Sequence, residues 1–205
     1  LIAWLDGHLG GVREMTVPMC FPAPDAAVLA EIATLFDGIE PGAVLVMDHI
    51  YGCMLLPILS ARPFRLVLIY HHSMVEERGA GEVATSRNTA EQSALQLADA
   101  IIVTSDESRD YVIGHYGIAD EKIIIGKPGN DPAPQSAPHD GGPWHLLSVG
   151  AVIPRKRYEF LVEALAKVER SDWSLTIAGN TERYPDYVAH LQNLIETQGL
   201  ANHIT

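Results

Sequence analysis

The chain has 205 residues, of which 47% are hydrophobic, 20% charged and 7% aromatic, a composition typical of globular proteins and unlike disordered, collagenous or coiled-coil chains. It carries 14 lysines and arginines against 26 aspartates and glutamates, and the resulting net charge of −12 argues against DNA or RNA as the main partner. Two cysteines, Cys20 and Cys53, are too few for a disulfide framework and favour a cytoplasmic setting, and no apolar run reaches the roughly 20 residues of a transmembrane helix.

Apolar segments of strand length alternate with segments of helix length along the first part of the chain. The expected elements are a strand over 12–17, a helix over 25–36, a strand over 43–47, a helix over 51–60 interrupted near Pro57, a strand over 64–70, a helix over 87–99, a strand over 100–104, a helix through Tyr116 with Ser105 as N-cap and Gly117 as its end, and a strand over 122–126. Residues 1–5 favour a helix tail, in which case the usual first strand is missing. The alternation predicts parallel strands with helical crossovers and therefore an α/β fold.

A segment rich in proline and glycine, residues 128–143, follows without periodicity and predicts a connector between two domains. The alternation then restarts, with expected strands over 145–149 and 174–178, helices over 157–168 and 184–198, and a strand beginning at His203. We therefore expect a first domain over residues 1–131, a linker over 132–142 and the beginning of a second domain over 143–205. The second part is small for an independent core.

Polar residues follow several of the predicted strands, and ligands of open parallel sheets bind beyond the carboxyl ends of the strands. These residues are His71 and His72, Asp48 and His49, Thr104 and Ser105, and Gly150. Taken alone, the first two histidines fit a hydrogen-bonded strand end as well as a ligand contact. No histidine spacing suits zinc, so we expect no metal site.

A second candidate site lies where the chain leaves a predicted strand at Gly150, turns at Pro154 and enters a helix near Arg157. Arg155 and Lys156 would then lie beside a helix N-terminus, where free backbone amides and the two cations attract an anion such as a phosphate. The alternative is that both side chains simply project into solvent.

Three segments resemble the retaining glycosyltransferases of family 4, which have the GT-B fold of two Rossmann-like domains. They are HHSMVEERG (71–79), EQSALQLADAIIVTSDESRDYVIGHYGIADEKIIIGKPGND (91–131) and LLSVGAVIPRKRYEFLVEALAKV (146–168). The family pattern of an acid, an alanine-rich helix and Ala-Asp before a strand, followed by Pro-Gly-x-Asp before the hinge, is matched by Glu91, Ala94, Ala98, Asp99, Pro128, Gly129 and Asp131. The resemblance is best over residues 64–179.

This resemblance implies transfer of a sugar from a nucleotide-sugar donor to an acceptor, with retained anomeric configuration and without a metal ion or other cofactor. Lys156, with Arg155 and Gly150, would bind the donor diphosphate, and His71 or His72 would contact the donor sugar near the reacting carbon. The acceptor, which is a sugar, a lipid-linked molecule or a small molecule, is not identified.

On the acceptor side, the resemblance points to Arg87 and Ser73 as binding residues. For Arg87 the alternative is a solvent-exposed residue at the start of a helix. Family relatives work in the bacterial cytoplasm, some of them peripherally at the membrane, although the acidity of this chain argues against strong attachment to anionic lipid.

Two positions depart from the family pattern: Ala151 stands where most relatives have arginine, and Arg157 where they have glycine. The Glu-x7-Glu element of the family is expected beyond Thr205, so we expect a chain truncated at both ends, inactive alone and derived from a protein of about 350 residues. Two alternatives stay open: a non-catalytic relative that binds a nucleotide-sugar or a partner protein, which Ala151 favours, and another GT-B enzyme such as a nucleotide-sugar epimerase.

Overall fold

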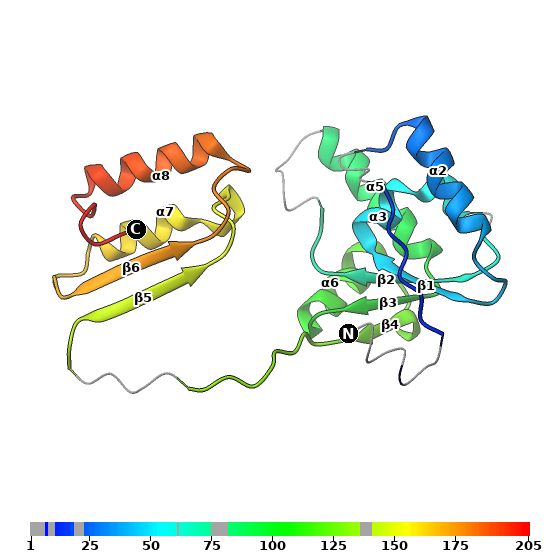
Figure 1. Cartoon of the computed structure of the whole chain (residues 1–205), viewed down its shortest axis with the longest axis horizontal. Coiled ribbons are helices and arrows are strands. Elements are labelled where there is room, and N and C mark those ends of the chain that lie inside the picture. Colours follow the sequence, from blue (N-terminus) through cyan, green and yellow to red (C-terminus); the bar gives the residue numbers. More distant parts are fainter. Residues whose placement is uncertain (1–6, 8–10, 19–22, 61, 75–81, 136–140) are drawn as a thin grey trace. The chain divides into compact units, whose positions relative to one another are not determined.

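The computed structural model describes residues 7, 11–18, 23–60, 62–74, 82–135 and 141–205, with the backbone alone for residues 82–87 (Figure 1). The chain divides into two compact units, Leu1–Asn130 and Asp131–Thr205, and each has a hydrophobic core of its own. Part of the predicted linker, residues 136–140, lies outside the described residues.

The first unit is built on a parallel sheet with the strand order β1-β2-β3-β4. Its strands are β1 (Val44–Asp48), β2 (Arg65–Tyr70), β3 (Ala100–Val103) and β4 (Ile123–Ile125). Asp48 lies opposite Ile69 in the parallel pairing of β1 with β2, so both strands end at the same edge of the sheet. The predicted α/β class is confirmed.

Helices connect these strands, and they begin and end largely where the sequence predicts. They are α2 (Ala26–Asp37), α3 (His49–Met54), α4 (Leu56–Leu59), α5 (Glu82–Leu97), α6 (Asp106–Tyr116) and the 3-10 helix η1 (Asp120–Lys122). The side chain of Asp25 caps α2 by accepting a hydrogen bond from Val28 N at 2.9 Å. Ser105 caps α6 in the same way, and Gly117 ends α6 with a φ of 67°.

The predicted strand over 12–17 is wrong, because this segment forms neither helix nor strand. Met15 and Val17 instead pack against the core as partly buried side chains. These two alternate side chains are therefore apolar because they contact the core, although the segment pairs with no strand. Helix α5 begins earlier than predicted, at Glu82. The predicted helix tail over residues 1–5 lies outside the described residues.

The family-like pattern at the end of α5 has a structural role. Asp99 Oδ2 accepts hydrogen bonds from Leu66 N and from Arg62 Nη2, both at 2.7 Å, and Asp99 N donates to Leu66 O at 2.8 Å. The bond from Leu66 N is the main cause that lowers the pKa of Asp99. Ala94 on α5 and Ala98 just after it are fully buried. Their small side chains let this part of the chain pack closely within the core. These residues therefore fix α5 against the start of β2.

The second unit contains two parallel strands, β5 (Trp144–Val149) and β6 (Trp173–Ala178). Helices α7 (Tyr158–Leu165) and α8 (Pro185–Thr197) complete two βα units. Ile204 bridges in parallel to Leu175, close to the predicted strand start. The helix predicted over 157–168 is α7, which ends earlier, at Leu165, and a 3-10 helix, η2 (Pro154–Lys156), precedes it.

Among the residues that the structure describes, no helix is long and apolar enough to cross a membrane.

Arg157 separates η2 from α7 with a φ of 54°, and it is the one non-glycine residue with positive φ in the described part of the chain. Its guanidinium lies 4.8 Å from the ring centroid of Phe160 and 3.3 Å from Glu159 Oε1. We expect Arg157→Gly to be more stable than Arg157→Ala by about 1 kcal/mol, because both variants lose these contacts and only glycine relieves the left-handed backbone. Thermal unfolding of the two variants measures this difference, and equal melting temperatures would contradict it.

Candidate functional site

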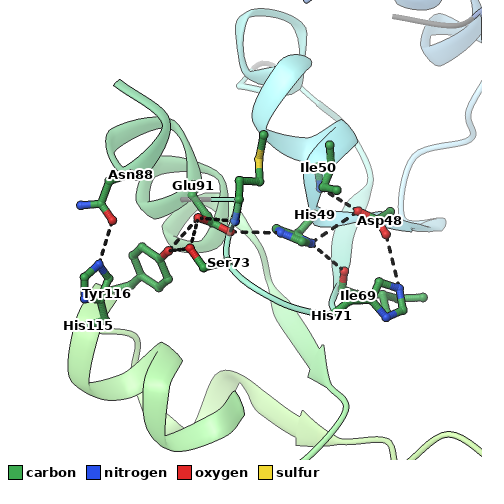
Figure 2. A network of polar contacts seen from close by, with 11 residues as sticks. Asp48, His49, Ile50, Ile69, His71, Ser73, Asn88, Glu91, His115 and Tyr116 are labelled. Atoms are coloured by element: carbon green, nitrogen blue, oxygen red, sulfur yellow. Dashed lines mark hydrogen bonds and ion pairs between the residues drawn. The ribbon is translucent and has the colours of Figure 1, made fainter. Parts of the chain in front are cut away.

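The carboxyl ends of β1 and β2 bring a carboxylate and an exposed imidazole together (Figure 2). Asp48 ends β1, and its Oδ1 accepts a hydrogen bond from Ile50 N at 2.8 Å at the start of α3. His71 directly follows β2, and its Nε2 lies 3.3 Å from Asp48 Oδ2. The His71 side chain is 51% exposed, so a ligand can reach it. This edge of the sheet is where α/β proteins bind ligands.

His49, the first residue of α3, is completely buried behind this pair. Its Nδ1 lies 3.3 Å from Ile69 O and 3.4 Å from Asp48 Oδ1, and its Nε2 lies 3.1 Å from Glu91 Oε1. All three partners are acceptors, so both ring nitrogens must carry protons and the ring is an imidazolium. Burial alone would lower the pKa of His49, but the hydrogen bonds and charges of Asp48 and Glu91 outweigh it and raise the pKa to about 9.

Glu91 of α5 is also fully buried and holds the chain that follows β2. Its two carboxylate oxygens accept hydrogen bonds from Met74 N at 3.0 and 3.2 Å, and Oε2 accepts from Ser73 Oγ at 3.0 Å and from Tyr116 Oη at 2.7 Å. Burial would raise the pKa of Glu91, but the donors around it, His49 foremost, lower it. Glu91 is therefore a buried carboxylate that ties α3, α6 and the segment after β2 to α5.

Two more pKa shifts follow from the same arrangement. Burial raises the pKa of Tyr116, and the Glu91 carboxylate adds to this effect, so the phenol stays protonated and can donate. For Asp48 burial acts to raise the pKa, but hydrogen bonds from His49 and Ile50 N outweigh it and lower the pKa. The network therefore holds two carboxylates around one buried cation.

The structure separates the residues predicted for the first unit. His71 is exposed and His72 is only partly exposed, so His71 is the better placed for a ligand contact. Ser73, predicted to bind the acceptor, is 1% exposed and its hydroxyl is engaged with Glu91 and Tyr116 inside the protein. The side chain of Arg87 lies outside the described residues.

In the second unit, two of the residues predicted to bind the donor diphosphate, Lys156 and Gly150, are neighbours. The Lys156 Cε lies 3.6 Å from the position that a Cβ on Gly150 would occupy, so the lysine stem runs along the carboxyl end of β5. Tyr158 Oη donates a hydrogen bond to Gly150 O at 2.9 Å and fixes this corner. Both Arg155 and Lys156 are exposed.

Arg155 and Lys156 lie just before the N-terminus of α7, as predicted, but the backbone amide of Tyr158 at that terminus is not free. They belong to η2, and the first turn of α7 already has partners: Tyr158 N donates to Tyr187 Oη at 3.0 Å, and Tyr187 Oη donates in turn to Glu159 Oε2. Burial raises the pKa of Tyr187 to about 12. Burial also acts to raise the pKa of Glu159, but the hydrogen bonds that Glu159 accepts, from Tyr187 foremost and also from Arg157, lower it. The α7 terminus thus carries its own carboxylate, and an anion near Lys156 would depend on the side-chain cations.

Within the part of the chain that the structure describes, no three His, Cys, Asp or Glu side chains gather in a way that could hold a metal ion.

The sequence predicts Asp48 and His49 at a strand end and Glu91 on a helix, but nothing in the local pattern connects them. One signal was present: Glu91 shares a helix face with Ala94 and Ala98, and a carboxylate on a buried face requires hydrogen-bonding partners. The identity of those partners depends on the fold, because His49 is 42 residues away along the chain.

Solved structures share this fold. HepE of Anabaena, crystallised with UDP, has a TM-score of 0.64 at 17% identity, over 88% of this chain and 51% of that chain. A glycosyltransferase from Rickettsia africae has a TM-score of 0.57 at 17% identity, over 100% and 56%. A TarM variant of S. aureus, crystallised with UDP among its ligands, has a TM-score of 0.62 at 12% identity, over 87% and 36%. This chain therefore spans about half or less of the length of these proteins.

The parallel sheet, its polar carboxyl edge and these structural likenesses define a protein of the Rossmann-like GT-B class. A search of curated proteins finds no match. Two family models match the sequence: Glycosyltransferase Family 4 over residues 13–133 and Glycosyl transferases group 1 over residues 130–205. The chain belongs to Glycosyltransferase Family 4.

Proposed function

We propose that the protein containing this chain transfers a sugar from a nucleotide-sugar donor to an acceptor, with retention of the anomeric configuration. The bond from the anomeric carbon to the diphosphate breaks, a bond to the oxygen of an acceptor hydroxyl forms, and a nucleoside diphosphate leaves with the bonding electrons and takes up the proton that the hydroxyl loses. The growing negative charge on that leaving group must be stabilised, which is the main electrostatic task of such a site. The proposal includes a cytoplasmic location and no metal ion or other cofactor.

The observation that carries this proposal is the corner formed by Lys156 and Gly150 in a chain whose two parts both match glycosyltransferase family models. The Lys156 ammonium group, with Arg155 on the same turn, would bind the donor diphosphate. Gly150 has no side chain and would let the diphosphate approach the end of β5 closely. His71 would contact the donor sugar, because its ring is exposed at a ligand-binding strand end. The structural neighbours crystallised with UDP make a uridine nucleotide the first donor to try.

Lys156→Ala tests the proposal in the full-length protein. We expect kcat to fall about 100-fold or more, because one well-placed cation contributes roughly 3 kcal/mol to the barrier, and we expect UDP to bind more weakly in calorimetric titration. Lys167→Ala is the matched control, because Lys167 is an exposed lysine just beyond the other end of α7 and should leave both values unchanged. Equal effects of the two variants would contradict the role of Lys156.

Arg87→Ala separates donor and acceptor roles in the same assay. It should mainly raise the KM for the acceptor, and a loss in kcat as large as that of Lys156→Ala would contradict the assignment. The non-catalytic alternative, favoured by Ala151, predicts that the wild-type protein binds UDP and UDP-sugars but neither transfers nor hydrolyses the sugar.

A further inference from the structure

One carboxylate group, that of Asp48, lies between two histidines that occupy very different environments (Figure 2). Its Oδ1 accepts from Ile50 N at 2.8 Å and lies 3.4 Å from Nδ1 of the buried His49. Its Oδ2 lies 3.3 Å from Nε2 of the exposed His71. The orientation of this carboxylate therefore determines which atom the exposed imidazole meets.

The buried side of this arrangement has little freedom to move. His49 is 0% exposed, donates to Ile69 O at 3.3 Å and to Glu91 Oε1 at 3.1 Å, and its ring centroid lies 4.7 Å from that of Tyr70. Glu91 in turn receives donors from both ends of the segment Ser73–Met74. One buried carboxylate thus holds both the imidazolium behind Asp48 and the backbone just after His71.

The polar groups around this network come from five elements. They are Asp48 at the end of β1, His49 and Cys53 on α3, Glu91 on α5, and Tyr116 on α6, with Tyr70, His71 and Ser73 at or after the end of β2. The charges among them are two carboxylates and one buried imidazolium. The Asp48 carboxylate is the one that faces the exposed His71.

From this geometry we infer that Asp48 is a positioning residue for His71: held by His49 and Glu91 from the interior, it fixes the ring orientation of His71 and keeps its proton on Nε2. A carboxylate can only accept, so the His71 nitrogen that faces it carries hydrogen. Nδ1 is then the nitrogen of the neutral ring that accepts a hydrogen bond, for example from a sugar hydroxyl. The link to catalysis rests on the proposed function, whereas the link between Asp48 and the His71 ring does not.

Asp48→Asn gives a sharp test. The position of Oδ1 is held by two donors, Ile50 N and the His49 ring, so the amide oxygen should stay there and the amide NH2 group should replace Oδ2. That group donates to the facing nitrogen, so the neutral ring of His71 should move its proton from Nε2 to Nδ1. Ring-nitrogen NMR of the full-length protein measures the tautomer without substrate, and Asp110→Asn is the control because Asp110 is an exposed aspartate on α6.

The two parts of the inference can fail separately. Reversal of the His71 tautomer in Asp48→Asn, together with a fall of tenfold or more in kcat at a donor KM within twofold of wild type, supports both the positioning role and the proposed function. Tautomer reversal with unchanged kcat supports the positioning role and contradicts the role of His71 in transfer. An unchanged tautomer overturns the inference.

A wild-type measurement keeps the inference testable if the variant does not fold. The neutral His71 ring of the unaltered protein must be protonated at Nε2, with a ratio of the Nε2-H to the Nδ1-H tautomer about threefold or more above that of a free histidine, as expected for an exposed hydrogen bond to a carboxylate. Protonation at Nδ1 in the wild-type protein overturns the inference without any substitution.

Discussion

Glu91→Ala should lower the free energy of unfolding of the first unit by about 3–5 kcal/mol, because removing one partner of a buried ion pair leaves the other charge without compensation. Here the remaining charge is the His49 imidazolium, which is 0% exposed. The same change removes the acceptor of Ser73 Oγ, Met74 N and Tyr116 Oη. Buried donors that lose their acceptor add their own desolvation cost.

Urea unfolding followed by NMR or by hydrogen exchange in the first unit measures this loss. Glu31→Ala is the control, because Glu31 is exposed on α2 and its replacement should change stability by less than about 0.5 kcal/mol. The loss of unfolding free energy in Glu91→Gln should lie between those of Glu91→Ala and Glu31→Ala. Glutamine keeps the side-chain volume, but its NH2 group then faces other hydrogen-bond donors. Equal stability of the two alanine variants would show that Glu91 does not hold this core.

The pH dependence distinguishes loss of the ion pair from loss of packing. The pKa of His49 is raised from 6.5 to about 9, so its contribution is fully present below pH 6.5 and is lost as the pH rises through 9. The pKa of Glu91 is lowered, so its contribution is present above its unfolded pKa and is lost as the pH falls through the folded value. The wild-type protein should therefore lose on the order of 2–3 kcal/mol between pH 6 and 10, and Glu91→Ala should show a much smaller change.

The course of the backbone could be predicted from local sequence wherever one residue type determines it. Asp25, Ser105 and Gly117 mark helix ends because their side chains or left-handed backbone satisfy local hydrogen bonds. The segment 64–70 predicts a buried strand because its residues other than Arg65 are apolar on both faces. The strand predicted over 12–17 is wrong because a short alternating pattern does not show whether a partner strand lies beside it.

The site was only partly predictable, because its chemistry arises from residues that are distant in sequence. The strand ends and Lys156 could be found from local pattern, and the structure places Lys156 beside Gly150. The buried cation at His49 could not be found in this way, because the protonation of His49 depends on Glu91. Only the packing of α5 against α3 brings Glu91 close to His49. The hydrogen bond that occupies Tyr158 N at the start of α7 could not be predicted for the same reason, since its acceptor Tyr187 comes from α8.

Gly179→Ala should be the most disruptive single change in the second unit. A Cβ at this position would lie 1.9 Å from Gly150 O and 2.5 Å from Gly150 C, which are backbone atoms that cannot rotate away. The segments that follow β5 and β6 are held at this spacing by two hydrogen bonds. They run from Gly150 N to Ala178 O and from Val152 N to Asn180 O, both at 2.9 Å. Relief of the overlap requires these bonds to break, so we expect a loss of about 3 kcal/mol or more.

Two alanine substitutions calibrate this prediction. Gly150→Ala meets the hydroxyl of Tyr158 at 3.2 Å and the flexible stem of Lys156 at 3.6 Å, so it should cost about 1 kcal/mol. Gly114→Ala, on α6, meets nothing within 4 Å and should be neutral or stabilising by about 0.5–1 kcal/mol. Hydrogen exchange at the amides of Gly150 and Val152 should accelerate in Gly179→Ala alone. If these amides stay protected there, the ends of β5 and β6 accommodate a methyl group at Gly179 without losing these hydrogen bonds, which contradicts the prediction.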